Sequence, residues 1–378
     1  MSEILPEAHF EIPPGLTVVV PASDFLRQRI AGLSGIARSV IMADLAGART
    51  IHIIADRPVP QDWHRSFAVR ERPLPDVIIE SEAPRADSGD RLLVLDPDRL
   101  TTAHGLDRLI AGEPPAALHD GSDYYTAAPA SEIGWRIMTG SMKPGEGWVG
   151  RNINRPISFR IASFLLRFDI SPNPVTWFTL GLAVVMSVLL SLGGPLWLAV
   201  GGALYQAVSV IDCVDGDIAR VSYQRSRNGA AFDTACDMLA NMGFVVGVTI
   251  GIVRTYGTLH LEVALAMVVV AALCIAAMTL LVRAGPGKGS FDVLRAALTL
   301  RLAQRPLLGK VVLTGEKMFK RDFYALLAAV LCVSGLAWVI PQAGLVGVII
   351  WLLAIVWCAP LIAGDKHGAL LPAHLRER

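Results

Sequence analysis

Cysteine is absent from this 378-residue chain before Cys213. The five cysteines lie between Cys213 and Cys358, and no two of them form a CxxC pair. A disulfide framework and a cysteine-ligated zinc site are therefore not expected. We expect all five cysteines to be small, buried, apolar residues.

Charge is also scarce. Charged residues make up 18% of the chain, whereas soluble proteins usually carry about a quarter. The net charge is +1, so no nucleic-acid partner is expected. The N-terminal stretch "MSEILPEAHFEIPPG" lacks the basic start and the apolar run of a signal peptide. We therefore expect the N-terminal region to stay in the cytoplasm.

Apolar residues are abundant, at 53%, and they concentrate in the second half of the chain. A membrane-spanning helix needs about 20 apolar residues. Six stretches meet this requirement, at about 174–193, 195–215, 232–253, 260–282, 322–340 and 343–363. The sequence thus predicts a six-helix, all-α membrane domain.

Basic residues predict how these spans are oriented. They gather before the first span, after the second span, and between Arg283 and Arg321. Because short cytoplasmic loops are rich in lysine and arginine, we expect both termini in the cytoplasm of a multi-pass protein of the cell inner membrane.

Two basic segments are expected to lie along the membrane surface. "NRPISFRIASFLLRF" places Ile157, Ile161, Phe164, Leu165 and Phe168 on one helical face, with Arg160 and Arg167 elsewhere. This is typical of an interfacial amphipathic helix. The segment "FDVLRAALTLRLAQRPLLGK" has a similar character, and a plain linker helix is the alternative for both.

The N-terminal region alternates predicted strands with helices. Strands are expected at 15–22, 50–56, 76–81 and 91–100, and "GIARSVIMADLAGAR" is expected to form an amphipathic helix ending near Gly47. This order predicts an α/β domain with a mainly parallel sheet. Asp96 and Asp98 close the last strand, where turn residues are more usual than metal ligands.

Five aspartates interrupt the apolar half of the chain between Asp212 and Asp237. Asp212 and Asp215 share a helical face, as do Asp233 and Asp237 on the next helix, whereas Asp217 points away. Converging carboxylates repel one another unless a cation compensates them. Oxygen ligands favour Mg²⁺, Mn²⁺ or Ca²⁺, and magnesium commonly also binds substrate phosphates.

The pattern Asp212-x-x-Asp215-Gly216-x-x-Ala219-Arg220, eight residues, then Gly229-x-x-x-Asp233-x-x-x-Asp237 resembles the signature of the CDP-alcohol phosphotransferase (CDP-alcohol phosphatidyltransferase) family. Pro172, Asn173 and Thr176, before the first span, resemble the family's Pro-Asn-x-x-Thr entry into the membrane. The resemblance covers about residues 150–365.

The resemblance implies a site and a reaction. Asp212, Asp215, Asp233 and Asp237 would hold two Mg²⁺ or Mn²⁺ ions, and Asp237 would also act as general base. The CDP part of the donor would meet Asn173, Thr176, Asp215, Gly216, Ala219, Arg220 and Gly229. An acceptor hydroxyl would attack the phosphorus distal to cytidine, and CMP would leave, as in phospholipid biosynthesis.

The substrates stay open at this point. The donor is expected to be CDP-diacylglycerol, with a soluble CDP-alcohol as the alternative. Arg225, Arg227 and Arg283 are candidates for an acceptor phosphate, as in inositol-phosphate transfer. Met238 disfavours that acceptor, because relatives that use inositol phosphate often carry arginine after the last aspartate. An ion pathway or an inactive scaffold are alternatives from other classes.

The N-terminal domain resembles a nucleotidyltransferase of the sugar-nucleotide type. After its first strand comes "PASDFLRQRIAG", with no glycine before Gly32 to form a phosphate loop. We therefore expect residues 1–140 to be a cytoplasmic, non-catalytic domain that regulates, dimerises or docks a partner. Residues 141–170 would form the interfacial helix and linker, 171–365 the transferase domain, and 366–378 a cytoplasmic tail. The family pattern further implies a homodimer in contact with membrane lipids.

Overall fold

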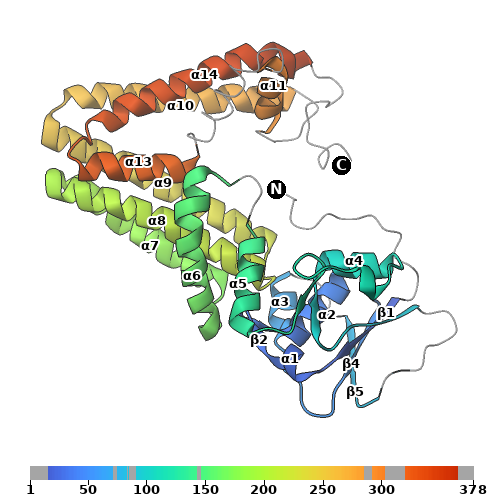
Figure 1. The fold of residues 1–378 in the computed structure, drawn as a ribbon. Coiled ribbons are helices and arrows are strands. Elements are labelled where there is room, and N and C mark those ends of the chain that lie inside the picture. Colours follow the sequence, from blue (N-terminus) through green and yellow to red (C-terminus); the bar gives the residue numbers. More distant parts are fainter. Residues whose placement is uncertain are drawn as a thin grey trace.

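The computed structural model describes residues 16–70, 75–82, 84, 91–142, 146–284, 292–302 and 320–364. Within these residues every strand precedes Ala127, and the chain after it is helical (Figure 1). The predicted division into an α/β region and a mostly helical region is therefore confirmed.

A four-stranded parallel sheet forms the centre of the α/β domain. Its strands are β1 (Leu16–Pro21), β4 (Thr50–Ile54), β5 (Asp76–Glu80) and β6 (Arg91–Val94), in the order β5-β4-β1-β6. Residues of β1 are buried almost throughout, as expected for a central parallel strand covered on both faces. The predicted parallel sheet is confirmed.

The predicted strand over 91–100 is confirmed at Arg91–Val94, but its predicted extent is wrong, because the chain turns after β6. The backbone N–H of Asp98 donates to Asp96 Oδ1 at 2.9 Å, which closes a local turn after β6. The next strand, β7 (Arg99–Thr101), pairs antiparallel with β8 (Tyr124–Thr126) in a separate two-stranded sheet. The Asp96 side chain thus stabilises a turn.

Five helices and a small hairpin surround the sheets. They are α1 (Asp24–Arg27), the hairpin β2 (Arg29–Ile30) and β3 (Leu33–Ser34), α2 (Gly35–Leu45), α3 (Trp63–Arg70), α4 (Ala103–Ile110) and α5 (Ala130–Gly140), with a 3₁₀ turn at Pro115–Ala117. The amphipathic character predicted for α2 is wrong, because residues 35–43 are all buried. Even Arg38 is buried, and it donates to the carbonyls of Ile30 at 2.9 Å and Ala31 at 2.8 Å.

Among the described residues of the second region, five helices are long and apolar enough to cross a membrane. They are α7 (Pro172–Leu192), α8 (Pro195–Val221), α9 (Arg227–Tyr256), α10 (Leu259–Ala284) and α14 (Val339–Gly364). A sixth spanning helix at 322–340 is not confirmed. Helix α13 (Arg321–Val333) has 13 residues, a rise of about 20 Å against a hydrocarbon core of about 30 Å. It ends because Gly335 adopts the left-handed region, with φ of 75°.

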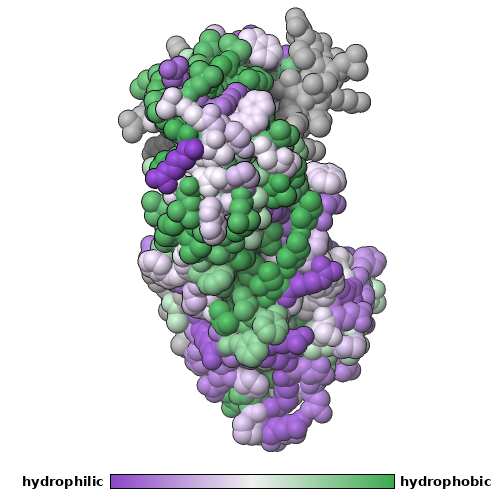
Figure 2. Space-filling view, turned by 90° about the vertical axis from the view of Figure 1, so that its left-hand side faces the viewer, coloured by the Kyte–Doolittle hydropathy of each residue, from purple (hydrophilic) through white to green (hydrophobic). Residues whose placement is uncertain are grey.

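The helices pack in two groups. Helices α7, α8, α9 and α13 share one apolar core, in which Tyr205 stacks on Phe244 with ring centroids 3.8 Å apart. Helices α10 and α14 form a second core with α11 (Asp292–Leu302). All five cysteines are free and buried, as predicted. Figure 2 shows apolar side chains covering the helical part and hydrophilic ones gathering over the α/β domain.

Helix α6 (Arg155–Leu165) lies crosswise to α7, α8 and α9 (Figure 1). A π-helical turn at Gly150–Asn154 precedes it, and a 3₁₀ turn at Leu166–Phe168 follows. Phe159 is buried, whereas Ile157, Phe164 and Phe168 are exposed. An exposed apolar edge on a crosswise helix fits the predicted interfacial placement, which stays a prediction. The second basic segment, α11, packs against α14, and residues 303–310 of that segment lie outside the described residues.

Candidate active site

Four aspartates of the sequence pattern lie where α8 ends and α9 begins. The turn 222–226 joins these two helices and brings their ends together. One carboxylate oxygen from each of Asp212, Asp233 and Asp237 lies within 4.8 Å of the others. The structure therefore gathers three of the four carboxylates expected to hold metal into one group.

Asp215, the fourth predicted ligand, faces Thr176 instead. It is 4% exposed, and its Oδ2 accepts a hydrogen bond from the Thr176 hydroxyl at the start of α7. Both residues were predicted from the sequence to lie on the CDP side of the site. The structure thus joins α7 to α8 through two residues of the predicted donor site.

Arg321 was not among the predicted site residues. It is the first residue of α13, and its guanidinium donates to Asp212 and to Asp237. In the sequence it stands out only as a basic residue at the end of a loop. A cation between two carboxylates offsets the repulsion between their negative charges.

The three carboxylates fit a divalent cation by their chemistry. They offer only oxygen ligands, which hard cations such as Mg²⁺ and Mn²⁺ prefer. The single guanidinium of Arg321, which pairs with Asp212 and Asp237, offsets only part of the negative charge of three carboxylates. The side chains of Asp212 and Asp237 are 14% and 30% exposed, so the group is partly open to solvent.

Asp217 lies in a different network, away from the group formed by Asp212, Asp233 and Asp237. Its Oδ1 accepts from Arg155 Nη1 at 2.6 Å and also from Arg220, and its Oδ2 accepts from the Ser158 hydroxyl at 2.6 Å. Arg155 also bonds Glu146 at 2.7 Å. The side chain of Asp217 is completely buried, so the carboxylate compensates two buried arginines and ties α6 to α8.

The Asp217 network predicts a stability effect rather than a silent substitution. Asp217→Asn is expected to cost on the order of 3 kcal/mol, because it leaves two buried guanidinium groups under-compensated. The thermal midpoint in detergent should fall by several degrees, whereas Asp98→Asn, in an exposed turn, should leave it unchanged. A stable but inactive Asp217→Asn protein would contradict this interpretation and place Asp217 at the metal group.

The small residues of the pattern lie where helices approach one another. A Cβ on Gly229 would meet Ser226 Oγ at 2.9 Å and would lie 3.9 Å from Asn173 Oδ1. Ser226 caps α9 by accepting from the Gly229 amide at 2.9 Å. The first turns of α7 and α9 therefore lie together, which brings Gly229 next to Asn173.

Two residues of the pattern that follow Gly216 on α8 differ in their surroundings. Ala219 is half-buried, and Arg220 is bound to Asp217. A Cβ on Gly216 would meet Arg220 Nη1 at 3.3 Å, so the Arg220 guanidinium lies close to that glycine. Arg220 thus lies beside the site with part of its charge already compensated.

Arg225, in the turn between α8 and α9, is an under-compensated cation. Among the described residues, no acidic side chain pairs with it, and its Nη1 is buried without a hydrogen-bond partner. Burial, and after it the charge of Arg220, lowers the pKa of Arg225 to about 10. Such a group favours a bound anion. The side chains of Arg227 and Arg283 lie outside the part of the chain that the structure describes.

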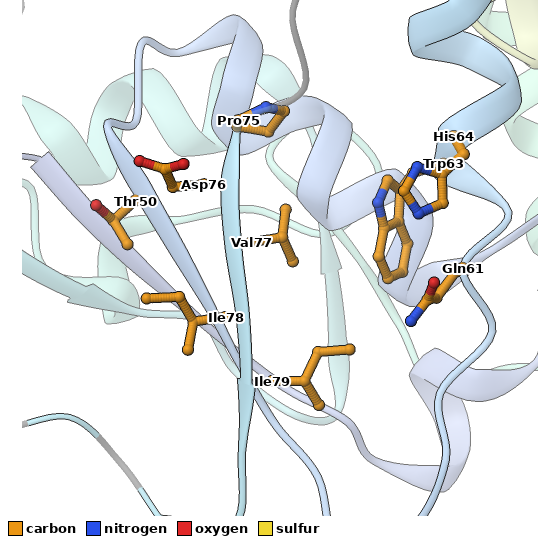
Figure 3. Close-up of a pocket in the computed structure, with 9 residues that line it drawn as sticks. All are labelled: Thr50, Gln61, Trp63, His64, Pro75, Asp76, Val77, Ile78 and Ile79. Carbon is orange, nitrogen blue, oxygen red and sulfur yellow. The ribbon is translucent and has the colours of Figure 1, made fainter.

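The α/β domain has a pocket of its own along the edge strand β5. Trp63 and His64 of α3 lie on one side of β5. Thr50 of β4 and the side chain of Asp76, the first residue of β5, lie on the other side (Figure 3). The described residues that line it include no lysine or arginine. This pocket therefore offers little to compensate the charge of a triphosphate.

Comparison with known proteins identifies the helical region. The family profile described as CDP-alcohol phosphatidyltransferase matches residues 169–359, just over half of the chain. A bifunctional IPC transferase and DIPP synthase of Thermococcus kodakarensis is 33% identical over 111 residues, 29% of this chain and 24% of the relative. Its counterpart in Aquifex aeolicus is 34% identical over 109 residues, again 29% and 24%.

A third relative is shorter. The phosphatidylinositol phosphate synthase of Corynebacterium glutamicum is 29% identical over 123 residues, 32% of this chain and 55% of the relative. The matches thus span about a quarter of the first two relatives and about half of the third. The profile match agrees with the aspartate pattern and confirms the resemblance stated from sequence. The chain therefore belongs to the CDP-alcohol phosphatidyltransferase family.

Proposed function

We propose that the protein transfers a phosphatidyl group from a CDP-linked lipid, CDP-diacylglycerol, to the hydroxyl of a polar alcohol, with release of CMP. The observation that carries this proposal is the group formed by Asp212, Asp233 and Asp237 at the joined ends of two membrane-length helices. The family match and the names of the relatives support the reaction class.

Asp212, Asp233 and Asp237, with Asp215 beside them, are proposed to hold two Mg²⁺ or Mn²⁺ ions. Bound divalent cations would stabilise negative charge on the attacking and leaving oxygens of an in-line displacement. The donor's CDP part is proposed to lie against Asn173, Thr176, Gly216, Ala219, Arg220 and Gly229. Gly229 and Asn173 adjoin, which supports a single donor site built from α7, α8 and α9.

Asp237 is proposed to accept the proton of the acceptor hydroxyl. Its side chain is about twice as exposed as that of Asp212, at 30% against 14%, so a second substrate reaches it more easily. As the proton moves to the Asp237 carboxylate, the acceptor oxygen forms a bond to the phosphorus distal to cytidine. The bond from that phosphorus to the CMP oxygen breaks, and CMP leaves with the electron pair.

The acceptor is proposed to carry a phosphate. Arg225 supports this, because it is a partly buried cation without an acidic partner among the described residues. Met238 offers no charge to such a phosphate, which leaves Arg225 as the described candidate. One relative is named a phosphatidylinositol phosphate synthase, which supports an inositol-phosphate-like acceptor despite Met238.

Arg225→Gln is expected to raise KM for the phosphorylated acceptor by roughly 10- to 100-fold, since a hydrogen bond to a charged group contributes about 1.5–3 kcal/mol. KM for the CDP donor should change little. Arg167→Gln is the matched control, because Arg167 is exposed near the same end of the helices. A rise confined to the donor KM would instead place Arg225 at the donor's phosphates.

The α/β domain is proposed to be a cytoplasmic, non-catalytic relative of the nucleotidyltransferases. Its parallel sheet supports the likeness, and the lack of arginine and lysine among the described lining residues of its pocket supports the loss of activity. We further propose an inner-membrane homodimer with both termini in the cytoplasm. This requires the shorter helix α13, which shares the apolar core of α7, α8 and α9, to serve as the sixth crossing. This hydrophilic domain touches the turns that precede α7 and α9, close in sequence to Arg167 and Arg225, and basic residues at this end of the helices support that orientation.

The proposed reaction is tested by mass spectrometry of the products of the purified full chain. CDP-diacylglycerol and a soluble CDP-alcohol are each supplied with Mg²⁺ and a panel of alcohols that includes inositol phosphate. A new phospholipid that appears together with CMP is expected from CDP-diacylglycerol. A product from the soluble donor alone would overturn the proposed donor, and no product from either would overturn the proposed reaction.

A further inference from the structure

The α/β domain touches the helical region at the two turns that lead into the proposed donor site. One turn lies between α6 and α7, and the other lies between α8 and α9. Figure 1 shows the α/β domain at this end of the helices, with its helix α5 next to α6. The first residues of α7 and α9 therefore lie close to a domain far from them in sequence.

At the first turn, Asp169 binds two arginines of the α/β domain. Arg65 Nη1 lies 2.9 Å from Asp169 Oδ1, and Arg29 pairs with the same carboxylate. Burial raises the pKa of Asp169, but the hydrogen bonds and charges of Arg29 and Arg65 outweigh it, so this pKa lies below its ordinary value. Arg29 also donates to the Leu166 carbonyl at 3.2 Å. Helix α7 begins three residues after Asp169, at Pro172.

At the second turn, Ser222 and Tyr223 are held by the α/β domain. The Ser66 hydroxyl donates to the Ser222 carbonyl at 2.8 Å, and both residues are buried. The Tyr223 side chain packs against the apolar core of the α/β domain, with the Arg38 guanidinium 5.6 Å from its ring centroid. Tyr223 has a φ of 54°, an unfavourable conformation for a bulky residue. Surrounding contacts must maintain such a conformation.

The second turn leads directly into the donor site. Three residues after Tyr223, Ser226 caps α9 through the Gly229 amide, and Gly229 lies beside Asn173 of α7. A change in the backbone at Tyr223 would therefore shift the first turn of α9 relative to α7. The metal-group residues Asp233 and Asp237 lie deeper in α9, where packing between the long helices positions them.

We propose that the α/β domain is a positioning element of the transferase, which holds Asp169, Ser222 and Tyr223 so that the first turns of α7 and α9 form the donor site. This inference rests on the proposed function and names the part of the reaction that the domain serves, namely binding of the CDP donor. Tyr223 and Ser66 are positioning residues, since they act through Gly229 and Asn173.

The test compares Tyr223→Ala, Tyr223→Phe and Ser66→Ala in the full chain. Tyr223→Ala is expected to raise KM for the CDP donor at least tenfold while kcat changes less than threefold. Ser66→Ala is expected to raise it by roughly 2- to 10-fold, as for loss of one neutral hydrogen bond. Tyr223→Phe should raise the donor KM less than Tyr223→Ala does, because the ring keeps its packing and only the hydroxyl that bonds Arg38 is lost. Tyr124→Ala, on β8 and stacked on Arg99, is the matched control.

Hydrogen exchange supplies a readout that does not depend on turnover. Peptides covering 224–232 are expected to exchange at least tenfold faster in Tyr223→Ala, because the cap of α9 loosens. Unchanged exchange in this variant would overturn the role of the contacts. Faster exchange with an unchanged donor KM would overturn the positioning of the donor site. If Tyr223→Ala does not fold, the same two outcomes apply to Ser66→Ala. A wild type that releases no CMP would overturn the proposed function itself and this role with it.

Discussion

Asp233→Asn is expected to abolish CMP release and divalent-cation binding together. Asp233 is one of three carboxylates whose oxygens lie within 4.8 Å of one another, so it contributes a full negative charge to one shared group. An asparagine keeps the shape but removes that charge, and hard cations bind neutral amides more weakly than carboxylates. Asp212→Asn is expected to behave in the same way. Mn²⁺ binding followed by electron paramagnetic resonance measures the loss without reference to activity.

The matched control for Asp233→Asn is Asp98→Asn. Asp98 is an exposed aspartate in the turn after β6, so this change alters the same atoms without touching the carboxylate group. It should leave Mn²⁺ binding and turnover at the wild-type level. A folded Asp233→Asn protein that binds Mn²⁺ with unchanged affinity would show that this group does not hold the metal.

Asp237→Asn is expected to lower kcat by about 10²- to 10⁴-fold, the usual contribution of a positioned general base. Affinity for the CDP donor should stay within about threefold of the wild type, as expected when only a transition-state interaction is lost. The reason is positional. Asp237 lies one helical turn beyond Asp233, away from the turn where Gly229 meets Asn173.

Kinetics and binding on the same protein decide between two roles of Asp237. Donor affinity is measured by titration with the CDP donor in the absence of acceptor, and kcat is measured with both substrates saturating. If donor affinity falls in proportion to activity, Asp237 is chiefly a metal ligand. The general base would then have to be another residue.

Local patterns in the sequence predicted much of this structure. The strands of the parallel sheet follow short apolar runs, and the membrane-length helices follow long ones. Asp212 from α8 and Asp233 and Asp237 from α9 converge because helical periodicity places residues three or four apart on one face. A short turn between two helices then brings these faces together.

Contacts between residues far apart in the chain were not predictable in this way. Arg321 reaches Asp212 across 109 positions and Asp237 across 84, and no local periodicity indicates such a pair. Arg155 meets Asp217 across 62 positions. The end of α13 at Val333 depends on the left-handed conformation of Gly335, which the continuous apolar stretch at 322–340 conceals.

The contacts between the two domains were likewise not predictable from the sequence. All residues of the aspartate pattern follow residue 170, so the sequence suggests that the helical region works without the α/β domain. The contacts of Ser66 and Arg38 with the turn between α8 and α9 argue for coupling instead. The sequence offered no sign of these contacts, because a serine and an arginine in an α/β domain have many ordinary roles.

Metal-dependent phosphatidyl transfer is measured most directly as CMP release from CDP-diacylglycerol by the purified full chain. The assay contains an inositol-phosphate-like acceptor and is run with and without Mg²⁺. We predict CMP formation that needs both acceptor and cation, is removed by chelation, and is absent in Asp233→Asn but retained in Asp98→Asn. CMP release that survives chelation, or that Asp233→Asn retains, would contradict the assignment of the carboxylate group as the metal-dependent centre of a phosphatidyl transfer.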